Sequence, residues 1–141
     1  MYTNNPKTEQ WKHNIRFAQF YKSHEIFDIL RETDTDCIVT LHGFLRIIPP
    51  DLCYRHVILN GHPGLINFYP ELKGKDPQER VLQKPYEMIG SVVHYCTLEV
   101  DGGDIVDWCA VKNTCLTVED VYNKLRETSL LSWKNYLEGK L

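Results

Sequence analysis

The 141-residue sequence lacks the features that would place it in several broad classes of protein. It has no apolar run near the about 20 residues that a membrane-spanning helix needs, and its first residues contain no apolar core typical of a signal peptide. Its net charge is −3, and its basic residues are scattered along the chain. We therefore expect a cytoplasmic protein that has neither a nucleic acid nor a membrane as partner.

Clustered metal ligands are also lacking. No two cysteines have the spacing of a Cys-x-x-Cys motif, and the number of cysteines is odd. Because zinc requires clustered cysteine and histidine ligands, we expect no metal site and reduced thiols, most of them buried. The five are Cys37, Cys53, Cys96, Cys109 and Cys115.

What is present is the composition of an ordinary globular protein, with 43% hydrophobic and 25% charged residues. A chain of this length can bury a core of its own, so we expect residues 1–141 to form a single domain. Residues 1–36 contain no glycine. Apolar residues recur there at roughly helical spacing from Trp11 to Leu30, which predicts one or two helices.

The middle of the chain has the pattern of a parallel strand pair. The apolar runs 37–41 and 56–59 predict strands that are buried on both faces. Between them, Pro50 is a favoured first residue for a short helix. A strand, a helix and a second strand make the βαβ unit of a parallel sheet.

The C-terminal half predicts further elements of both kinds. Asp76-Pro77 is typical of the start of a helix, here to about residue 82, and the loop 61–75 before it contains the solvated stretch Lys73-Gly74-Lys75. Strands at 91–98 and 105–111 would form an antiparallel pair around the turn 101–103. Residues 117–120 resemble a capping box before a C-terminal helix. That helix would be largely amphipathic, and its apolar residues are Val121, Leu125, Leu130, Leu131, Trp133 and Leu137; Trp108 and Trp133 are expected in the core.

These patterns predict an α/β fold with a mixed sheet of parallel strands and a C-terminal antiparallel pair, flanked by helices. In such a sheet, ligands bind beyond the carboxyl ends of parallel strands. Asn60 and His62 directly follow the predicted strand 56–59, and Asp101 lies in the turn of the antiparallel pair. If the turn joins them, an amide, an imidazole and a carboxylate share one site.

Those three groups suit acyl transfer. A carboxamide N–H can stabilise a developing oxyanion, and a carboxylate can orient a histidine and hold its proton. Taken singly, each has a simpler interpretation: Asn60 as a strand-ending residue, His62 as a loop histidine, and Asp101 as a turn residue before Gly102-Gly103.

The combination resembles a known family. Four blocks occur in one order and with family-like spacing: His42-Gly43-Phe44-Leu45-Arg46-Ile47-Ile48-Pro49, Leu59-Asn60-Gly61-His62-Pro63-Gly64, Gly90-Ser91-Val92-Val93-His94 and Val100-Asp101-Gly102-Gly103-Asp104-Ile105. They are similar to successive motifs of the folate-dependent formyltransferases, which include glycinamide ribonucleotide formyltransferase, methionyl-tRNA formyltransferase, sugar-nucleotide N-formyltransferases and formyltetrahydrofolate hydrolase. The resemblance spans roughly residues 25–112. It implies a Rossmann-like formyltransferase fold and 10-formyltetrahydrofolate as formyl donor.

The resemblance also implies residue roles. Asn60, His62 and Asp101 match the catalytic residues of the family, and His94 matches a supporting histidine. The residues that match the folate-binding segments are Phe44, Leu45, Arg46, Ile47 and Ile48 on one side, and Leu98, Glu99 and Val100 on the other.

The departures from the family concern the formyl acceptor. Family members begin with a strand and a glycine- and serine-rich turn that cradles the substrate phosphate in the glycinamide enzyme. The helical-looking segment 1–36 does not match that opening, and Gly61 and Gly64 stand where Ile or Leu and Ser are usual. The absence of a basic patch argues against tRNA as acceptor.

Three functions are therefore open. The first is formyl transfer to an amine of a small molecule, such as a nucleotide or nucleotide-linked sugar. The second is hydrolysis of formyltetrahydrofolate, and the third is a non-catalytic folate-binding or partner-binding role. A shortened sheet leaves an edge that needs cover, so we also expect a homodimer or coverage of that edge by the segment 9–31.

Overall fold

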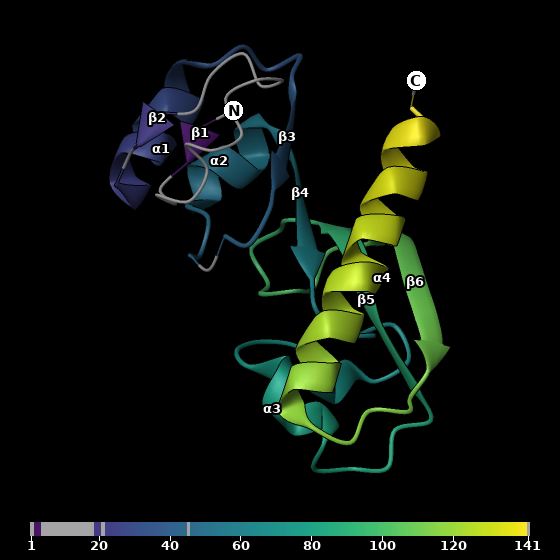
Figure 1. Cartoon of the computed structure of the whole chain (residues 1–141). Coiled ribbons are helices and arrows are strands. Elements are labelled where there is room, and N and C mark those ends of the chain that lie inside the picture. Colours follow the sequence, from purple (N-terminus) through teal and green to yellow (C-terminus); the bar gives the residue numbers. More distant parts are fainter. Residues whose placement is uncertain (1, 4–18, 21, 45, 141) are drawn as a thin grey trace.

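The computed structural model describes residues 2–3, 19–20, 22–44 and 46–140 (Figure 1). Its main sheet has four strands in the order β3-β4-β5-β6. These strands are Ile38–Leu41, Val57–His62, Met88–Tyr95 and Ile105–Lys112. β3 and β4 are parallel, whereas β5 is antiparallel to both β4 and β6. The predicted mixed α/β sheet is confirmed, and its antiparallel part begins one strand earlier than expected.

Two very short strands, β1 (Tyr2–Thr3) and β2 (Gln19–Phe20), form a separate parallel pair. The helices are α1 (Ser23–Glu32), α2 (Pro50–Arg55), α3 (Pro77–Val81) and α4 (Val118–Glu138), with one 3-10 turn, η2 (Pro70–Leu72). The helix predicted before residue 31 is confirmed over α1 and is wrong at 19–20, which lie in β2. Its part within 4–18 lies outside the described residues.

The helix starts follow from their first residues. Pro50 and Pro77 begin α2 and α3. The first N–H groups of a helix have no acceptor within the helix, so a proline there loses no helical hydrogen bond. The Thr117 hydroxyl accepts from the N–H of Asp120, whose carboxylate accepts from the N–H of Thr117, so the predicted capping box is confirmed. Asp76 precedes α3 as predicted, but it adopts a left-handed conformation and its side chain makes no capping bond.

Side chains on the strands alternate between the two faces of the sheet. One face is covered by α4: Leu59 and Val93 pack there against Trp133 and Tyr136, and Figure 1 shows α4 lying along β5 and β6. The opposite face carries an apolar cluster of Leu30, Leu41, Ile48, Leu52 and Ile58. A second cluster reaches both faces, because it joins Val92 and the loop and α3 residues Leu65, Ile66, Leu72 and Val81 to Ile89 and to Val121 and Leu125 of α4.

Several expectations about burial are wrong. β3 is an edge strand of the described sheet, and Ile38 is 51% exposed rather than buried on both faces. Trp108 lies on the other edge strand, β6, where it stacks edge-on against Phe68 and remains 47% exposed. On α4, Leu130, Leu131 and Leu137 are also exposed. All five cysteines are free, as expected, but Cys37 is exposed and the others are only partly buried.

The strand limits also differ from the predicted ones. β4 continues through His62, because its residues 59–62 pair with β5. β5 begins at Met88 and ends at Tyr95, three residues earlier at both ends than predicted. Within the described ranges, no helix has the length and apolar character needed to cross a membrane. The same ranges contain no group of three or more metal-ligating side chains.

Candidate active site

The strand register brings three polar side chains to one face of the sheet. Asn60 of β4 is the direct partner of His94 of β5. His62 lies two residues beyond Asn60, and residues two apart on a strand face the same side. This is the face opposite α4, next to the buried Leu41. Asn60 and His62 thus lie within a strand rather than in a loop after it.

Asp101 reaches the same place from the connection between β5 and β6. The N–H of Gly102 donates to the carbonyl of Glu99 over 3.1 Å, which closes a turn with Asp101 at its third position. Asp101 has a φ of 53°, a left-handed conformation that Asp and Asn tolerate better than most residues. The turn directs its carboxylate inward, where the side chain is only 10% exposed.

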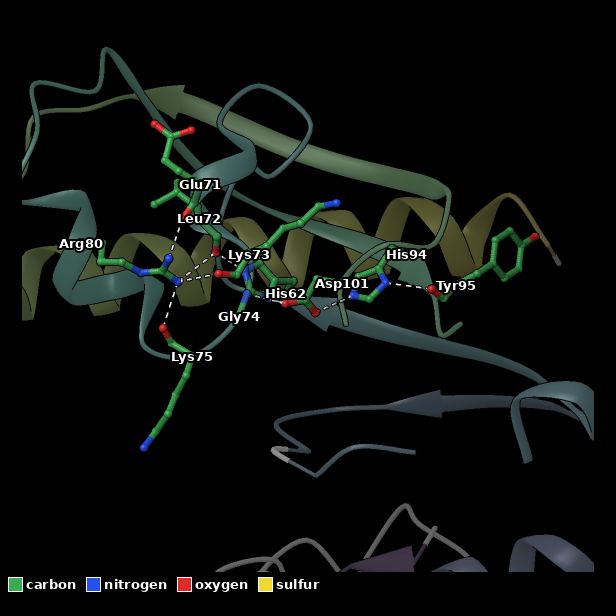
Figure 2. Close-up of polar contacts among 10 residues, drawn as sticks. All are labelled: His62, Glu71, Leu72, Lys73, Gly74, Lys75, Arg80, His94, Tyr95 and Asp101. Atoms are coloured by element: carbon green, nitrogen blue, oxygen red, sulfur yellow. Dashed lines mark hydrogen bonds and ion pairs between the residues drawn. The ribbon is translucent and has the colours of Figure 1, made fainter. Parts of the chain in front are cut away.

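The carboxylate of Asp101 lies between two histidines (Figure 2). Its Oδ2 is 3.3 Å from Nδ1 of His62, and its Oδ1 is 3.4 Å from Nε2 of His94. Both imidazoles are buried, at 5% and 2% exposure. Sequence analysis predicted this grouping, and the structure brings Asp101, His62 and His94 together.

The far nitrogen of each imidazole faces a backbone carbonyl. Nε2 of His62 is 2.9 Å from the oxygen of Leu72, and Nδ1 of His94 is 2.9 Å from the oxygen of Tyr95. A carbonyl only accepts, so each of those far nitrogens carries a proton. A second proton on either ring would become a hydrogen bond to the carboxylate. The geometry therefore allows either ring, when both of its nitrogens carry protons, to donate to a backbone carbonyl and to Asp101 at once.

The environment keeps Asp101 ionised. Burial alone raises the pKa of its carboxyl, but hydrogen bonds from His62 and His94, the charge of His62 and the N–H of Gly74 together hold the pKa well below its usual range. The Gly74 N–H donates to Oδ2 over 2.8 Å. The unliganded site thus holds a negative charge in a largely buried position.

The amide oxygen of Asn60, Oδ1, is buried and has no hydrogen-bond partner among the described residues. Rotating the amide by 180° would place its NH2 group there instead, because the two ends have nearly the same shape. A buried polar group without a partner is rare in proteins and is satisfied when a ligand supplies one. Asn60 therefore has hydrogen-bonding capacity to offer beside His62.

Sequence analysis missed the contribution of the loop 71–75. Lys73-Gly74-Lys75 was interpreted as a solvated stretch, yet the backbone of Leu72 contacts His62 and that of Gly74 contacts Asp101. Gly74 has a φ of 85°, which favours glycine. These contacts are made by backbone atoms, which every residue has, so residue types do not reveal them. The glycine at position 74 is the one feature of the sequence that could have indicated the tight loop.

Two of the residues that match the folate-binding segments, Phe44 and Ile48, belong to one apolar cluster. Ile48 is part of the cluster with Leu52, and Phe44 and Cys96 pack against it. Arg46, Glu99 and the apolar Ile47, Leu98 and Val100 are exposed. Leu45 lies outside the described residues. The two segments thus present exposed apolar side chains, and no described bond joins them.

His42, at the end of β3, stacks on Trp133 with ring centroids 4.3 Å apart. Burial lowers its pKa below the usual value. Since it contacts the α4 side of the sheet, it packs away from the Asp101 cluster.

Comparison with known proteins identifies the family. A family model described as formyl transferase matches residues 3–132. The chain belongs to the formyl transferase family. The chain is 34% identical over 95 residues to the phosphoribosylglycinamide formyltransferase of Escherichia coli, a match that covers 63% of this chain and 43% of that protein. It is 32% identical over 82 residues to the formyltetrahydrofolate deformylase of Bacillus subtilis, covering 57% of this chain and 26% of that one.

Its fold also matches solved members of the family. The crystal structure of phosphoribosylglycinamide formyltransferase from Anaplasma phagocytophilum superimposes with a TM-score of 0.75 at 26% identity, covering 96% of this chain and 70% of that one. The chain spans less than half of the length of the two curated relatives described above.

Proposed function

We propose that this protein transfers the formyl group of 10-formyltetrahydrofolate to an amine of a small molecule. The observation that carries the proposal is the Asp101 carboxylate held between His62 and His94, beside an Asn60 amide whose Oδ1 has no partner among the described residues, in a chain of the formyl transferase family. Relatives named for phosphoribosylglycinamide and for formyltetrahydrofolate support both the formyl chemistry and a folate donor.

In this proposal the amine nitrogen attacks the formyl carbon, and the carbonyl oxygen becomes an oxyanion. The amide of Asn60 and the protonated ring of His62 donate to that oxyanion, while Asp101 stabilises the imidazolium. As found, both nitrogens of His62 face protein oxygens, so the ring would have to share an N–H with the substrate. The amine gives up a proton to Asp101, directly or through water. The oxyanion then reforms the carbonyl as the C–N bond to the folate breaks, and N10 of the folate takes up the proton that the amine released.

The folate would lie over the exposed apolar residues Ile47, Leu98 and Val100, whose burial would favour binding. In this proposal the backbone groups of Arg46 and Ile48 bind the pterin ring, and Phe44 and Glu99 border the same site. Leu45 belongs to the same proposed segment by sequence.

Water is the second candidate acceptor. The observation in its favour is the relative from Bacillus subtilis, which is a formyltetrahydrofolate deformylase. The same oxyanion stabilisation serves an attacking water, and the products are then formate and the deformylated folate.

The test is to mix the purified protein with 10-formyltetrahydrofolate, with and without amines, and to measure deformylated folate and free formate. Transfer predicts folate release that depends on an amine, without formate. Hydrolysis predicts formate in the absence of any amine. No turnover under either condition, with folate binding demonstrated by calorimetry, would refute the enzymatic proposal and favour a non-catalytic folate-binding role.

Two variants assign the activity to this site. Asn60→Ala and Asp101→Ala should abolish turnover. Asn123→Ala and Asp104→Asn, which alter exposed side chains outside the proposed site, are the matched controls and should retain it.

A further inference from the structure

The guanidinium of Arg80 is surrounded by backbone carbonyls of the loop 71–75 (Figure 2). Its Nη1 donates to the oxygen of Glu71, and its Nη2 lies 2.9 Å from the oxygens of both Lys73 and Lys75. A fourth carbonyl, that of Leu72, is 3.3 Å from Nη2. One side chain thus fixes the course of almost the whole loop. Arginine suits this position because its planar guanidinium presents several N–H donors in a fixed, fork-shaped arrangement, whereas the ammonium of lysine is a single point of charge.

Two groups of this loop contact the Asp101 cluster. The carbonyl of Leu72 accepts from both Arg80 and Nε2 of His62. Two residues on, the N–H of Gly74 donates to Oδ2 of Asp101. Gly74 lies between Lys73 and Lys75, whose carbonyls are both bound by Arg80. Any displacement of these carbonyls would therefore move both backbone partners of the site.

Arg80 itself is held at the end of the short helix α3. Its neighbour Val81 is buried in the apolar cluster with Leu65 and Leu72. The guanidinium reaches back from this anchored point over the loop, and its Nε has no partner among the described residues. The loop makes a second contact on its outer side, where the hydroxyl of Tyr86 donates to the carboxylate of Glu71 over 3.1 Å. That contact touches a side chain of the loop and none of its carbonyls.

We propose that Arg80 is a positioning residue of the active site, which holds the loop 71–75 so that Leu72 orients the His62 ring and Gly74 binds Asp101. Arg80 itself touches neither the substrate nor the reacting atoms. The catalytic consequence rests on the proposed function, whereas the effect on the His62 ring does not.

The experiment therefore has a readout that needs no turnover. In 15N-labelled protein, the ring resonances of His62 are assigned by their loss in His62→Asn, and the Nε2–H bonded to Leu72 should exchange slowly with water. Arg80→Gln should shift these resonances or broaden the ring proton through faster exchange. Tyr86→Phe removes a hydrogen bond from the same loop and keeps the aromatic ring, so it serves as the control and should leave them unchanged.

Catalysis provides the second readout. Displacing a residue that orients a catalytic group typically lowers rate by about 10–100-fold. We expect Arg80→Gln to lower kcat in that range while the KM for 10-formyltetrahydrofolate changes by less than about 3-fold, a split that general unfolding would not give. Arg80→Lys, which keeps the charge without the fork, should lie between the wild type and Arg80→Gln in both readouts.

Unchanged His62 resonances in folded Arg80→Gln would overturn the positioning role. So would an equal shift in Tyr86→Phe, since the effect would then belong to the loop in general. Should Arg80→Gln fail to fold, Arg80→Lys decides by the same criterion. An inactive wild type whose His62 resonances still move in Arg80→Gln would refute the proposed function and leave the positioning role standing.

Discussion

Trp133 occupies the space that a side chain at position 61 would need. A Cβ added to Gly61 would lie 2.7 Å from Nε1 of Trp133, closer than real Cβ contacts allow. Gly61 faces α4, because it alternates with Asn60 and His62, which face the opposite side. The glycine of Asn60-Gly61-His62 is thus paired with a large side chain on α4. This accounts for a small residue where the family usually has Ile or Leu.

We expect Gly61→Ala to lower the free energy of unfolding by about 1–3 kcal/mol, the range typical of overpacking. In a Trp133→Leu background the same change should have a smaller effect, because the clashing indole is gone. Urea unfolding of the wild type, both single variants and the double variant gives the coupling energy directly. Strict additivity would contradict the contact.

Asn60→Ala should separate activity from stability. Loss of an oxyanion donor typically lowers kcat by about 10²–10³-fold. Because the buried Oδ1 has no partner among the described residues, its removal should leave the free energy of unfolding unchanged or slightly higher. Turnover assays and thermal unfolding of the same preparation test this. A parallel loss of stability and activity would mean that Asn60 is structural.

Asp101→Asn should lower stability in a pH-dependent way. The pKa of Asp101 is depressed in the folded protein, mainly by His62 and His94 acting against burial. The contribution of the carboxylate is therefore fully present above the unfolded-state pKa of about 3.9 and is lost as pH falls toward the folded-state pKa. We expect a loss of about 1–3 kcal/mol near neutral pH, the range for a buried group that loses its partner.

Urea unfolding from neutral pH down to pH 3 measures that difference. It should shrink below about pH 4, where the unfolded chain binds the proton of the wild-type carboxyl. Asp104→Asn changes an exposed residue of the same connection and is the matched control. A constant difference across the pH range would mean that the carboxylate charge contributes nothing.

The two glycines after Asp101 should respond differently to alanine. A Cβ on Gly103 would lie 1.9 Å from the carbonyl oxygen of Tyr95, which is backbone and cannot yield locally. A Cβ on Gly102 would meet the exposed side chain of Glu99, whose outer atoms can rotate away but whose Cβ, 2.6 Å distant, moves only if the turn 99–102 shifts. We expect Gly103→Ala to cost more than about 2 kcal/mol and Gly102→Ala a smaller amount, about 1–2 kcal/mol. Chemical denaturation of both variants tests the order.

Particular residues show which features of the fold and the candidate site can be predicted from the sequence. Pro50 and Thr117 begin helices as predicted, because proline geometry and hydroxyl capping are local effects. The strand runs were also found, but their exposure was not, since Ile38 and Trp108 lie on edge strands and sheet order is not a local property. The candidate residues Asn60, His62, His94 and Asp101 were identified from motifs whose spacing the sequence preserves.

The sequence by itself determined which side chains are the candidates for the chemistry, because their residue types and order are fixed along the chain. Only the tertiary structure decided how they are held. The register of β4 against β5 sets Asn60 beside His94, and the left-handed turn places Asp101 between two imidazoles. The backbone of Leu72 and Gly74 completes the site, and the fork of Arg80 fixes that backbone. Backbone atoms are the same in every residue, so their part in the site depends on where the folded chain puts them.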